Sequence, residues 1–270
     1  MAISWIEANG ASLRYALSGA GKDTLDTLVL VHEAGGCIES YDEALPPLEN
    51  QFRVLRYDQR GFGFSEKVRE LTFEGVVADL TALLDALHIT APVTLAGCAM
   101  GADYAVGFAA RHPARVAKLV IASPYIGSNV ARSPHSIERA ALVEREGIRA
   151  AMNASHDRSY PEHLRARDRE RFVRYQSRWV CNTPASFAAQ ARMMLNVDLT
   201  PEYAKIKAPT LVIGAKHDTQ RPPEIAQRVA NAIAGATAGA SYLLADTGHF
   251  MNVQTPQLFA ASVLNFCKSR

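Results

Sequence analysis

Short apolar runs alternate along the chain with longer stretches in which apolar residues recur every three or four positions. The runs predict buried strands at 28–31, 52–57, 92–96, 116–122, 209–213 and 241–245. The longer stretches predict helices at 40–50, 73–87, 102–111, 223–233 and 256–268. Strands that alternate with helices in this way indicate an α/β fold, with a mostly parallel sheet and helices on both of its faces.

Two parts of the chain depart from this alternation. Near the N-terminus, Ile3–Glu7 and Ser12–Leu17 have the character of strands, and Asn9-Gly10 between them favours a hairpin turn. Residues 124–199 contain no convincing strand and predict helices at 137–152 and 162–180. We therefore expect residues 1–123 and 200–270 to form the core and residues 124–199 to form a helical lid. The alternative is that this insertion merely extends the core.

The hydrophobic content, net charge and cysteine spacing of the chain limit the classes of protein to which it can belong. The chain has 270 residues, 48% of them hydrophobic, and a formal net charge of +2. The near balance of positive and negative charges argues against a nucleic-acid or membrane-surface partner. The four cysteines are scattered without a C-x-x-C pattern, which is typical of reduced thiols. No apolar run of about 18 residues and no signal peptide is evident. We expect a soluble cytoplasmic protein and leave open whether it forms a homo-oligomer.

The most informative stretch follows the strand predicted at 92–96. Gly97-Cys98-Ala99-Met100-Gly101 has the layout of a nucleophile elbow, G-x-S-x-G, with Ala99 where serine is expected. The flanking glycines suit a strained turn in which a Cβ would collide with neighbouring backbone. Ala99 carries no nucleophilic atom, so it cannot form an acyl-enzyme. We expect the thiol of Cys98 to point away from the loops discussed next, so it does not replace the serine.

Two later loops carry an acid and a base. Asp218 follows the strand at 209–213, and His249 follows the strand at 241–245. The carboxyl ends of parallel strands meet at one edge of a sheet, so these loops can converge with the elbow. Asp246 and Asp103 compete with Asp218; we expect Asp246 to cap a strand and Asp103 to face away. Ser155-His156-Asp157 is not a triad, because adjacent residues cannot converge.

No metal or cofactor is predicted. His32-Glu33 lacks the second histidine of H-E-x-x-H, and the remaining histidines besides His249 are scattered. Gly61-x-Gly63 lacks the third glycine of a dinucleotide-binding loop, and no Walker loop is present.

Taken together, these motifs resemble the α/β-hydrolase superfamily over nearly the full chain. The matching stretches are the His32 loop, Asp58-x-Arg60-Gly61-x-Gly63-x-Ser65, the elbow, Gly214-x-x-x-Asp218 and Gly248-His249. A closer resemblance is to the β-ketoadipate enol-lactone hydrolases. It rests on Asp198-Leu199, Ile206-Lys207-Ala208-Pro209-Thr210-Leu211, Arg221-Pro222-Pro223-Glu224 and Glu138-Arg139.

The resemblance implies a role for each site residue. His249 would be the general base, and Asp218 would orient it. The backbone N–H groups of Ala34 and Met100 would form the oxyanion hole. Glu33 stands where the superfamily usually has glycine, and this departure could place a carboxylate near the pocket.

The implied activity is hydrolysis of small carboxylic esters or enol-lactones through an acyl-enzyme, with a small-molecule substrate. Candidate pocket residues are His32, Glu33, Trp179 and Phe250. Arg132, Arg139, Arg178 and Arg192 could bind a substrate carboxylate, but such arginines are more often surface charges, and we select none of them. The alternative within this fold is a hydrolase of C–C bonds.

The alanine at position 99 has three explanations. The chain could be an engineered Ser-to-Ala variant of a hydrolase, a natural non-catalytic ligand-binding protein, or an enzyme in which His249 and Asp218 move protons without a covalent step. We favour the first, because a non-catalytic protein has no reason to keep the acid, the base and both glycines.

Overall fold

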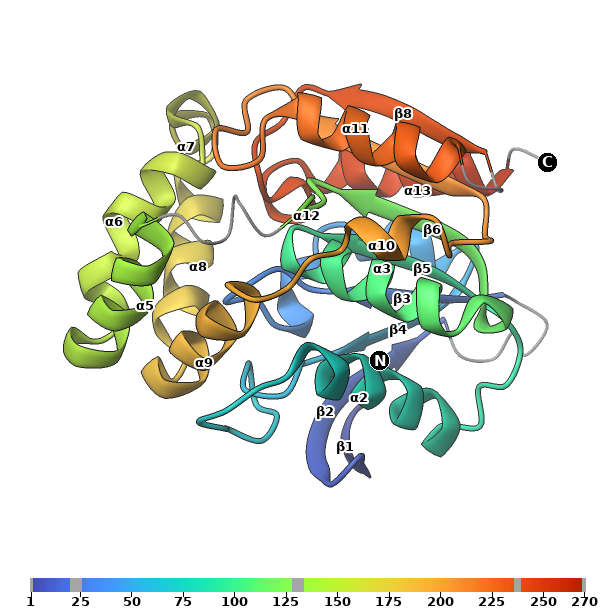
Figure 1. Cartoon of the computed structure of the whole chain (residues 1–270), viewed down its shortest axis with the longest axis horizontal. Coiled ribbons are helices and arrows are strands. Elements are labelled where there is room, and N and C mark those ends of the chain that lie inside the picture. The colour runs from blue at the N-terminus through green and yellow to red at the C-terminus, as the bar shows by residue number, and fades with distance from the viewer. Residues whose placement is uncertain (1, 20–25, 128–133, 236–238, 269–270) are drawn as a thin grey trace.

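The molecule is built on one eight-stranded sheet, whose strands are spread in Figure 1 from β8 at the top to β1 at the bottom, behind α2, α3 and α11. The computed structural model describes residues 2–19, 26–127, 134–235 and 239–268. The strand order is β1-β2-β4-β3-β5-β6-β7-β8. β1 and β2 pair antiparallel, as do β2 and β4, and every other neighbouring pair is parallel. The predicted α/β class and mostly parallel sheet are confirmed.

The strands are β1 (Ala2–Ala8), β2 (Ala11–Ser18), β3 (Thr27–Val31), β4 (Arg53–Tyr57), β5 (Val93–Cys98), β6 (Val116–Ala122), β7 (Thr210–Ala215) and β8 (Ala240–Ala245). The helices of the core are η1 (Ile38–Tyr41), α1 (Leu45–Glu49), α2 (Phe73–Ala86), α3 (Met100–Arg111), η2 (Pro113–Arg115), α11 (Pro223–Ala234), α12 (Met251–Gln254) and α13 (Pro256–Lys268). Between β6 and β7 lie α5 (Pro134–Glu146), α6 (Ile148–Ser159), α7 (Glu162–Arg167), α8 (Arg169–Val180), α9 (Pro184–Met194) and α10 (Thr200–Tyr203).

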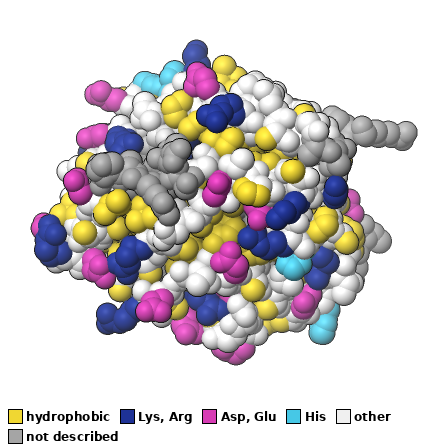
Figure 2. Space-filling view, in the orientation of Figure 1, with side chains coloured by type: hydrophobic (Ala, Val, Ile, Leu, Met, Phe, Trp, Pro, Cys, Tyr) yellow, Lys and Arg dark blue, Asp and Glu magenta, His cyan; other side chains and the backbone are white. Residues whose placement is uncertain are grey.

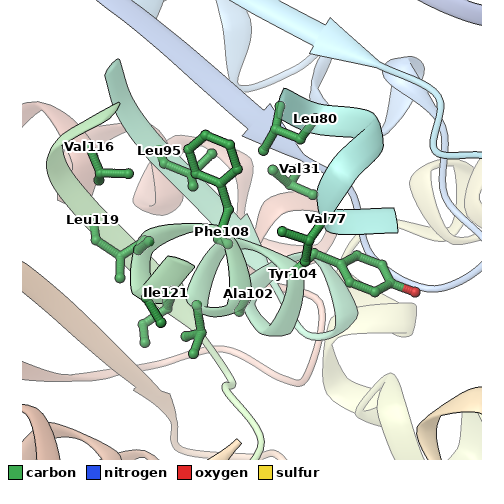
Figure 3. Close-up of a cluster of buried hydrophobic side chains, with 14 of the residues drawn as sticks. Val31, Val77, Leu80, Leu95, Ala102, Tyr104, Phe108, Val116, Leu119 and Ile121 are labelled. Carbon is green, nitrogen blue, oxygen red and sulfur yellow. The ribbon is translucent and has the colours of Figure 1, made fainter. Parts of the chain in front are cut away.

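Successive side chains of the central strands enter two separate cores. Val29, Val31 and Leu95 face the core beneath α2, α3 and α11. Leu28, Leu30 and Ala96 face the opposite core, beneath α1 and α13. Figure 3 shows the first core, where apolar side chains of α2 and α3 meet those of the sheet. Because β3 and β5 bury both faces, they appear in the sequence as continuous apolar runs rather than as alternating ones.

The α5–α9 helices stand together at one end of the sheet, on the left in Figure 1. Within the described part of residues 124–199 there is no strand. Trp179, Tyr175 and Phe172 of α8 are buried and share a core cluster with the face beneath α1 and α13. The insertion is therefore packed onto the sheet domain; its role as a lid remains a prediction.

Three predicted helices are broken in the structure. The helix expected at 40–50 is divided into η1 and α1, and α1 carries Pro46 and Pro47 at its start, where they are tolerated. The helix expected at 137–152 ends before Gly147, whose φ is +86°. The helix expected at 162–180 restarts at Asp168, whose side chain accepts the Arg171 N–H at 2.9 Å.

The surface carries charges of both signs. Figure 2 shows Lys and Arg side chains interspersed with Asp and Glu across the visible face. Two of the four arginines on α8 pair with the same carboxylate, Arg171 with Glu43 at 2.6 Å and Arg174 with Glu43 at 2.9 Å. In the portion of the chain that the structure describes, every helix is too short or too polar to cross a bilayer.

The first turn of α3 lies directly against the end of β3. A Cβ on Gly101 would collide with the carbonyl oxygen of Val31 and lie 2.6 Å from that of His32. A Cβ on Gly97 would collide with the backbone of Gly101. Both contacts involve backbone, which cannot yield as a flexible side chain can, so glycine is needed at each position.

We expect Gly101→Ala to reduce the free energy of unfolding by about 2 kcal/mol, because its methyl group would push α3 away from β3. Gly235→Ala is the matched control. Its φ is −68°, and the nearest atom to an added Cβ is 3.4 Å away, so we expect a change within about 0.5 kcal/mol. Urea unfolding of the two variants measures both effects. Equal losses would contradict the close approach of α3 to β3.

Candidate active site

Ala99 occupies the strained backbone position expected of a nucleophile elbow. Its φ and ψ are 52° and −116°, in a region that residues with a Cβ seldom occupy. Such a residue costs on the order of 1–3 kcal/mol and persists only where its surroundings hold it. Here the Ala99 N–H donates to the Ala122 carbonyl at 2.9 Å, and the Ala99 carbonyl accepts the Asp103 N–H at 3.2 Å. The turn between β5 and α3 therefore keeps its conformation without a serine.

Asp218 and His249 form a buried pair. Oδ2 of Asp218 lies 2.7 Å from Nδ1 of His249. Oδ1 of Asp218 accepts the backbone N–H groups of Gln220 and Arg221, both at 2.9 Å. Burial alone would raise the pKa of the Asp218 carboxyl, but His249 and these donors outweigh it and hold that pKa below its usual value. Asp218 thus favours the tautomer with the proton on Nδ1, which leaves Nε2 as the basic atom.

Asp246 and the histidine of the Ser155-His156-Asp157 sequence both contact residues other than Asp218 and His249. Asp246 is exposed, and its Oδ1 lies 2.7 Å from Nε2 of His217. His156 is enclosed by the rings of Tyr175 and Trp179, each with its centroid 4.9 Å away, and burial lowers the pKa of His156 to about 4. The structure therefore pairs His249 with Asp218 rather than with Asp246.

Asp103 pairs with Arg221 in a buried contact that sequence analysis missed. The two Nη atoms of Arg221 donate to the two carboxylate oxygens of Asp103, at 3.1 and 2.8 Å. The same guanidinium donates to the Ser123 carbonyl at 2.8 Å. Because the Arg221 backbone N–H also holds Asp218, this residue connects the acid loop to α3. The only sequence signal is an aspartate inside an alanine-rich helix.

The loop His32–Gly36, which we call the oxyanion loop, follows β3. In the described part of the chain, the backbone N–H groups of Ala34 and Met100 have no acceptor. Met100 is the first residue of α3, so its N–H also lies at the positive end of the helix dipole. The two N–H groups follow neighbouring strands of the sheet, β3 and β5, and are free to donate to a ligand.

His32 and Glu33 are both held by protein groups. Nδ1 of His32 lies 2.8 Å from the Glu33 carbonyl, and Nε2 accepts the Gln59 N–H at 3.0 Å. The Glu33 carboxylate is fully buried and accepts from Ser40 and Asn252, each at 2.8 Å. Glu33 therefore ties the oxyanion loop to η1 and to the segment that follows His249. No sequence signal indicates these partners.

Trp179 and Phe250 lie against two of the loops that carry candidate site residues. A Cβ on Gly35 would collide with the Trp179 indole, so this side chain rests directly on the oxyanion loop. Asn182 donates to the Gly35 carbonyl at 2.8 Å and adds a second contact from the insertion. The Phe250 ring centroid is 4.6 Å from that of His249. Both aromatic residues are buried, and each is close to one catalytic element.

The prediction for Cys98 was wrong. Its Sγ lies 3.4 Å from the His249 carbonyl oxygen, because the residues after β8 fold back over the end of β5. The thiol contacts the backbone of His249 and not its ring. Burial raises the pKa of Cys98 to about 12, so the thiolate needed for nucleophilic attack is not formed near neutral pH.

Among the described residues, Cys37, Glu39 and Asp58 bring one potential ligand atom each to within 4.8 Å of one another. This group does not fit a metal ion. Arg14 donates to Asp58 at 3.1 Å and to Glu39, so a cation already occupies the space between the carboxylates. Burial also raises the pKa of the Cys37 thiol and keeps it protonated.

The four arginines considered for a substrate carboxylate differ in their surroundings. Arg132 lies outside the described residues. Arg192 is paired with Glu144 at 2.6 Å. In the described part of the chain, Arg139 and Arg178 have no carboxylate partner. The guanidinium of Arg139 lies 5.9 Å from the centroid of the Phe187 ring.

We expect Asp103→Asn to reduce the free energy of unfolding by about 3–5 kcal/mol, because it leaves the buried guanidinium of Arg221 without its charged partner. Glu146→Gln removes one charge from the exposed Arg145–Glu146 pair and is the control, with an expected change below about 1 kcal/mol. Denaturant titration at pH 7 measures the free energy of unfolding of both variants. If the two variants were equally stable, Asp103 would not hold the acid loop to α3.

Comparison with known proteins agrees with this geometry. The family model described as "Serine aminopeptidase, S33" matches residues 22–244. The crystal structure of the enol-lactonase from Burkholderia xenovorans superposes with a TM-score of 0.91 at 28% identity and covers 98% of this chain and 100% of that chain.

Two curated relatives match over most of their length. Pyrrolizixenacetamide deacetylase of Xenorhabdus hominickii is 25% identical, over 98% of this chain and 97% of its own. 3-Oxoadipate enol-lactonase 1 of Acinetobacter baylyi is 23% identical, over 92% of this chain and 91% of its own. The α/β-hydrolase fold expected from the sequence is confirmed. The chain belongs to the serine aminopeptidase S33 family and is a hydrolase of the α/β-hydrolase superfamily.

Proposed function

We propose that this chain is a serine hydrolase of small carboxylic esters or lactones whose nucleophile position is occupied by Ala99. One observation carries the proposal. The Asp218–His249 pair, at 2.7 Å, accompanies an elbow that keeps its strained backbone without a serine to use it. An alanine has no chemical use for a strained backbone. The strain is expected if this turn holds the side chain of residue 99 toward the base.

The chemistry follows from a hydroxyl at position 99. His249 Nε2 would take its proton while the oxygen attacks the substrate carbonyl, and Asp218 would stabilise the resulting imidazolium. The N–H groups of Ala34 and Met100 would bind the oxyanion. The imidazolium then protonates the leaving group, and a water activated by His249 releases the acid. With alanine at this position the covalent step cannot occur.

The relatives support a carboxylic-acid derivative as substrate. The enol-lactonases and the deacetylase named above act on different bonds, by their names a lactone and an acetamide, and both contain an acyl carbonyl. We give the ester or lactone preference over the amide because the enol-lactonase structure superposes on this chain with a TM-score of 0.91. A C–C bond hydrolase has no specific support from the geometry.

Arg139 supports a substrate that carries a carboxylate. Its guanidinium lies over the Phe187 ring, Phe187 contacts Trp179 at 4.9 Å between ring centroids, and Trp179 rests on Gly35. This series of contacts leads from Arg139 to the oxyanion loop. Burial, together with the nearby Arg158, lowers the pKa of Arg139 below its usual value, as expected for a cation without a carboxylate beside it.

We expect Ala99→Ser to create hydrolysis of p-nitrophenyl acetate and of small enol-lactones, with kcat about 10⁶-fold above the alanine chain. The same substitution combined with His249→Gln should remove most of this gain. Release of p-nitrophenol and ring opening of the lactones are the measurements. If Ala99→Ser stays inactive across the panel while the chain binds a small ligand, a non-catalytic protein or a His249-dependent reaction without a covalent step becomes the better account.

In the Ala99→Ser background, we expect Arg139→Met to raise KM for mono-p-nitrophenyl succinate by about 10- to 100-fold and to leave p-nitrophenyl acetate unchanged. Loss of a hydrogen bond to a charged group accounts for this magnitude. Arg192→Met is the control, because Glu144 already neutralises Arg192. Equal effects on both esters would show that Arg139 does not recognise the carboxylate.

A further inference from the structure

A cavity lies where the insertion meets the sheet domain. Its volume is about 440 Å³, within the range of small-molecule sites. The wall on the sheet side includes Cys37 and Phe64, and the wall on the insertion side includes Arg178, Cys181 and Asn182. None of the catalytic residues or oxyanion donors is part of the wall. The cavity therefore lies beside the candidate active site and shares Gly36 with the oxyanion loop.

The lining is mostly apolar and includes one highly exposed aromatic side chain. The Phe64 side chain is 72% exposed, the largest exposure among the large hydrophobic residues of the described chain. Its backbone is held by the Phe64 N–H, which donates to Asp58 at 2.7 Å, and the Arg14 guanidinium lies 4.8 Å from the ring centroid. An exposed aromatic ring at the mouth of a cavity is suited to contact with an apolar ligand.

The cavity also carries a positive charge that the protein leaves uncompensated. Glu39 and Asp58 at its base are both paired with Arg14. Lys67 donates to a backbone carbonyl of the wall. Within the described residues, Arg178 makes no ion pair and no side-chain hydrogen bond, and its Nε is buried without a partner. Arg178 is thus a cation of the wall without an ion pair, whereas Glu39, the carboxylate of the same wall, is already paired with Arg14.

A buried donor without a partner costs about 1–3 kcal/mol, so a group that accepts from Arg178 would bind favourably. A carboxylate matches the planar donor fork of a guanidinium. From the apolar lining and this free cation together, we propose that the cavity binds a small carboxylic acid with an apolar body. The carboxylate would accept from Arg178, and the apolar body would lie between Phe64 and Cys37. The proposal does not depend on hydrolysis.

The position of the site would connect it with the catalytic loops. Asn182 lines the cavity and donates to the Gly35 carbonyl, while Trp179, next to Arg178 on α8, packs on the same glycine. An occupant would contact the residues that support the oxyanion loop without touching the loop's N–H donors.

The test uses the chain as it exists, with Ala99. Cys181 is an exposed thiol in the cavity wall, and Cys267 is a partly exposed thiol on α13. Alkylation of each by iodoacetamide is followed by peptide mass spectrometry, with benzoate as the ligand probe and benzamide as its neutral counterpart. At four times its dissociation constant, benzoate should slow Cys181 alkylation about fivefold, because only the empty fraction reacts. Cys267 should be unaffected, and benzamide should give no protection.

Arg178→Met should abolish the protection. Arg174→Met, on the same helix, should retain it, because Glu43 and Glu170 already pair Arg174. Arg178→Lys should retain part of the protection, because lysine keeps the positive charge. This result would show that the cavity still forms when residue 178 is substituted. The proposal is overturned if benzoate fails to protect Cys181, if benzamide protects equally, or if protection persists in Arg178→Met. None of these results bears on whether Ala99→Ser hydrolyses esters.

Discussion

The contact between the first turn of α3 and the end of β3 determines the geometry of the whole site. Gly101 lies so close to the carbonyl groups of Val31 and His32 that no side chain fits between them. This contact fixes where β5 turns into α3, and so it holds Ala99 at a positive φ. It also brings the Met100 N–H beside the loop that carries the Ala34 N–H. Backbone packing thereby places residue 99 and the N–H groups of Ala34 and Met100, which we propose as the nucleophile position and the oxyanion donors.

Because backbone packing supplies this geometry, the site does not depend on the identity of residue 99. The acid and base are held by independent contacts, from Arg221 to Asp218 and from the insertion to His249 through Ser159. The insertion further supports the oxyanion loop through Trp179 and Asn182. This arrangement supports the proposal that the chain keeps a hydrolase scaffold while lacking the hydroxyl that would begin the reaction.

The sequence predicted those features that depend on local chemistry. The strand at 116–122 was placed to the residue because its apolar run is bounded on both sides. Asn9-Gly10 predicted the hairpin turn because both residues accept positive φ. The breaks at Gly147 and Asp168 were missed, because the apolar periodicity continues across them. The Arg221–Asp103 and Glu33–Asn252 contacts join residues more than 100 positions apart, and no local pattern encodes such pairs. Cys98 was misplaced for the same reason, since the chain that covers it comes from beyond β8.

The central claim is that position 99 is a nucleophile position in a scaffold that is otherwise ready to react. The most direct measurement is the intact mass of the Ala99→Ser variant after exposure to a fluorophosphonate, with the alanine chain treated in parallel. The account predicts one covalent adduct, located by peptide mapping at position 99, and none on the alanine chain. An unlabelled variant, or an adduct at another residue, would contradict it.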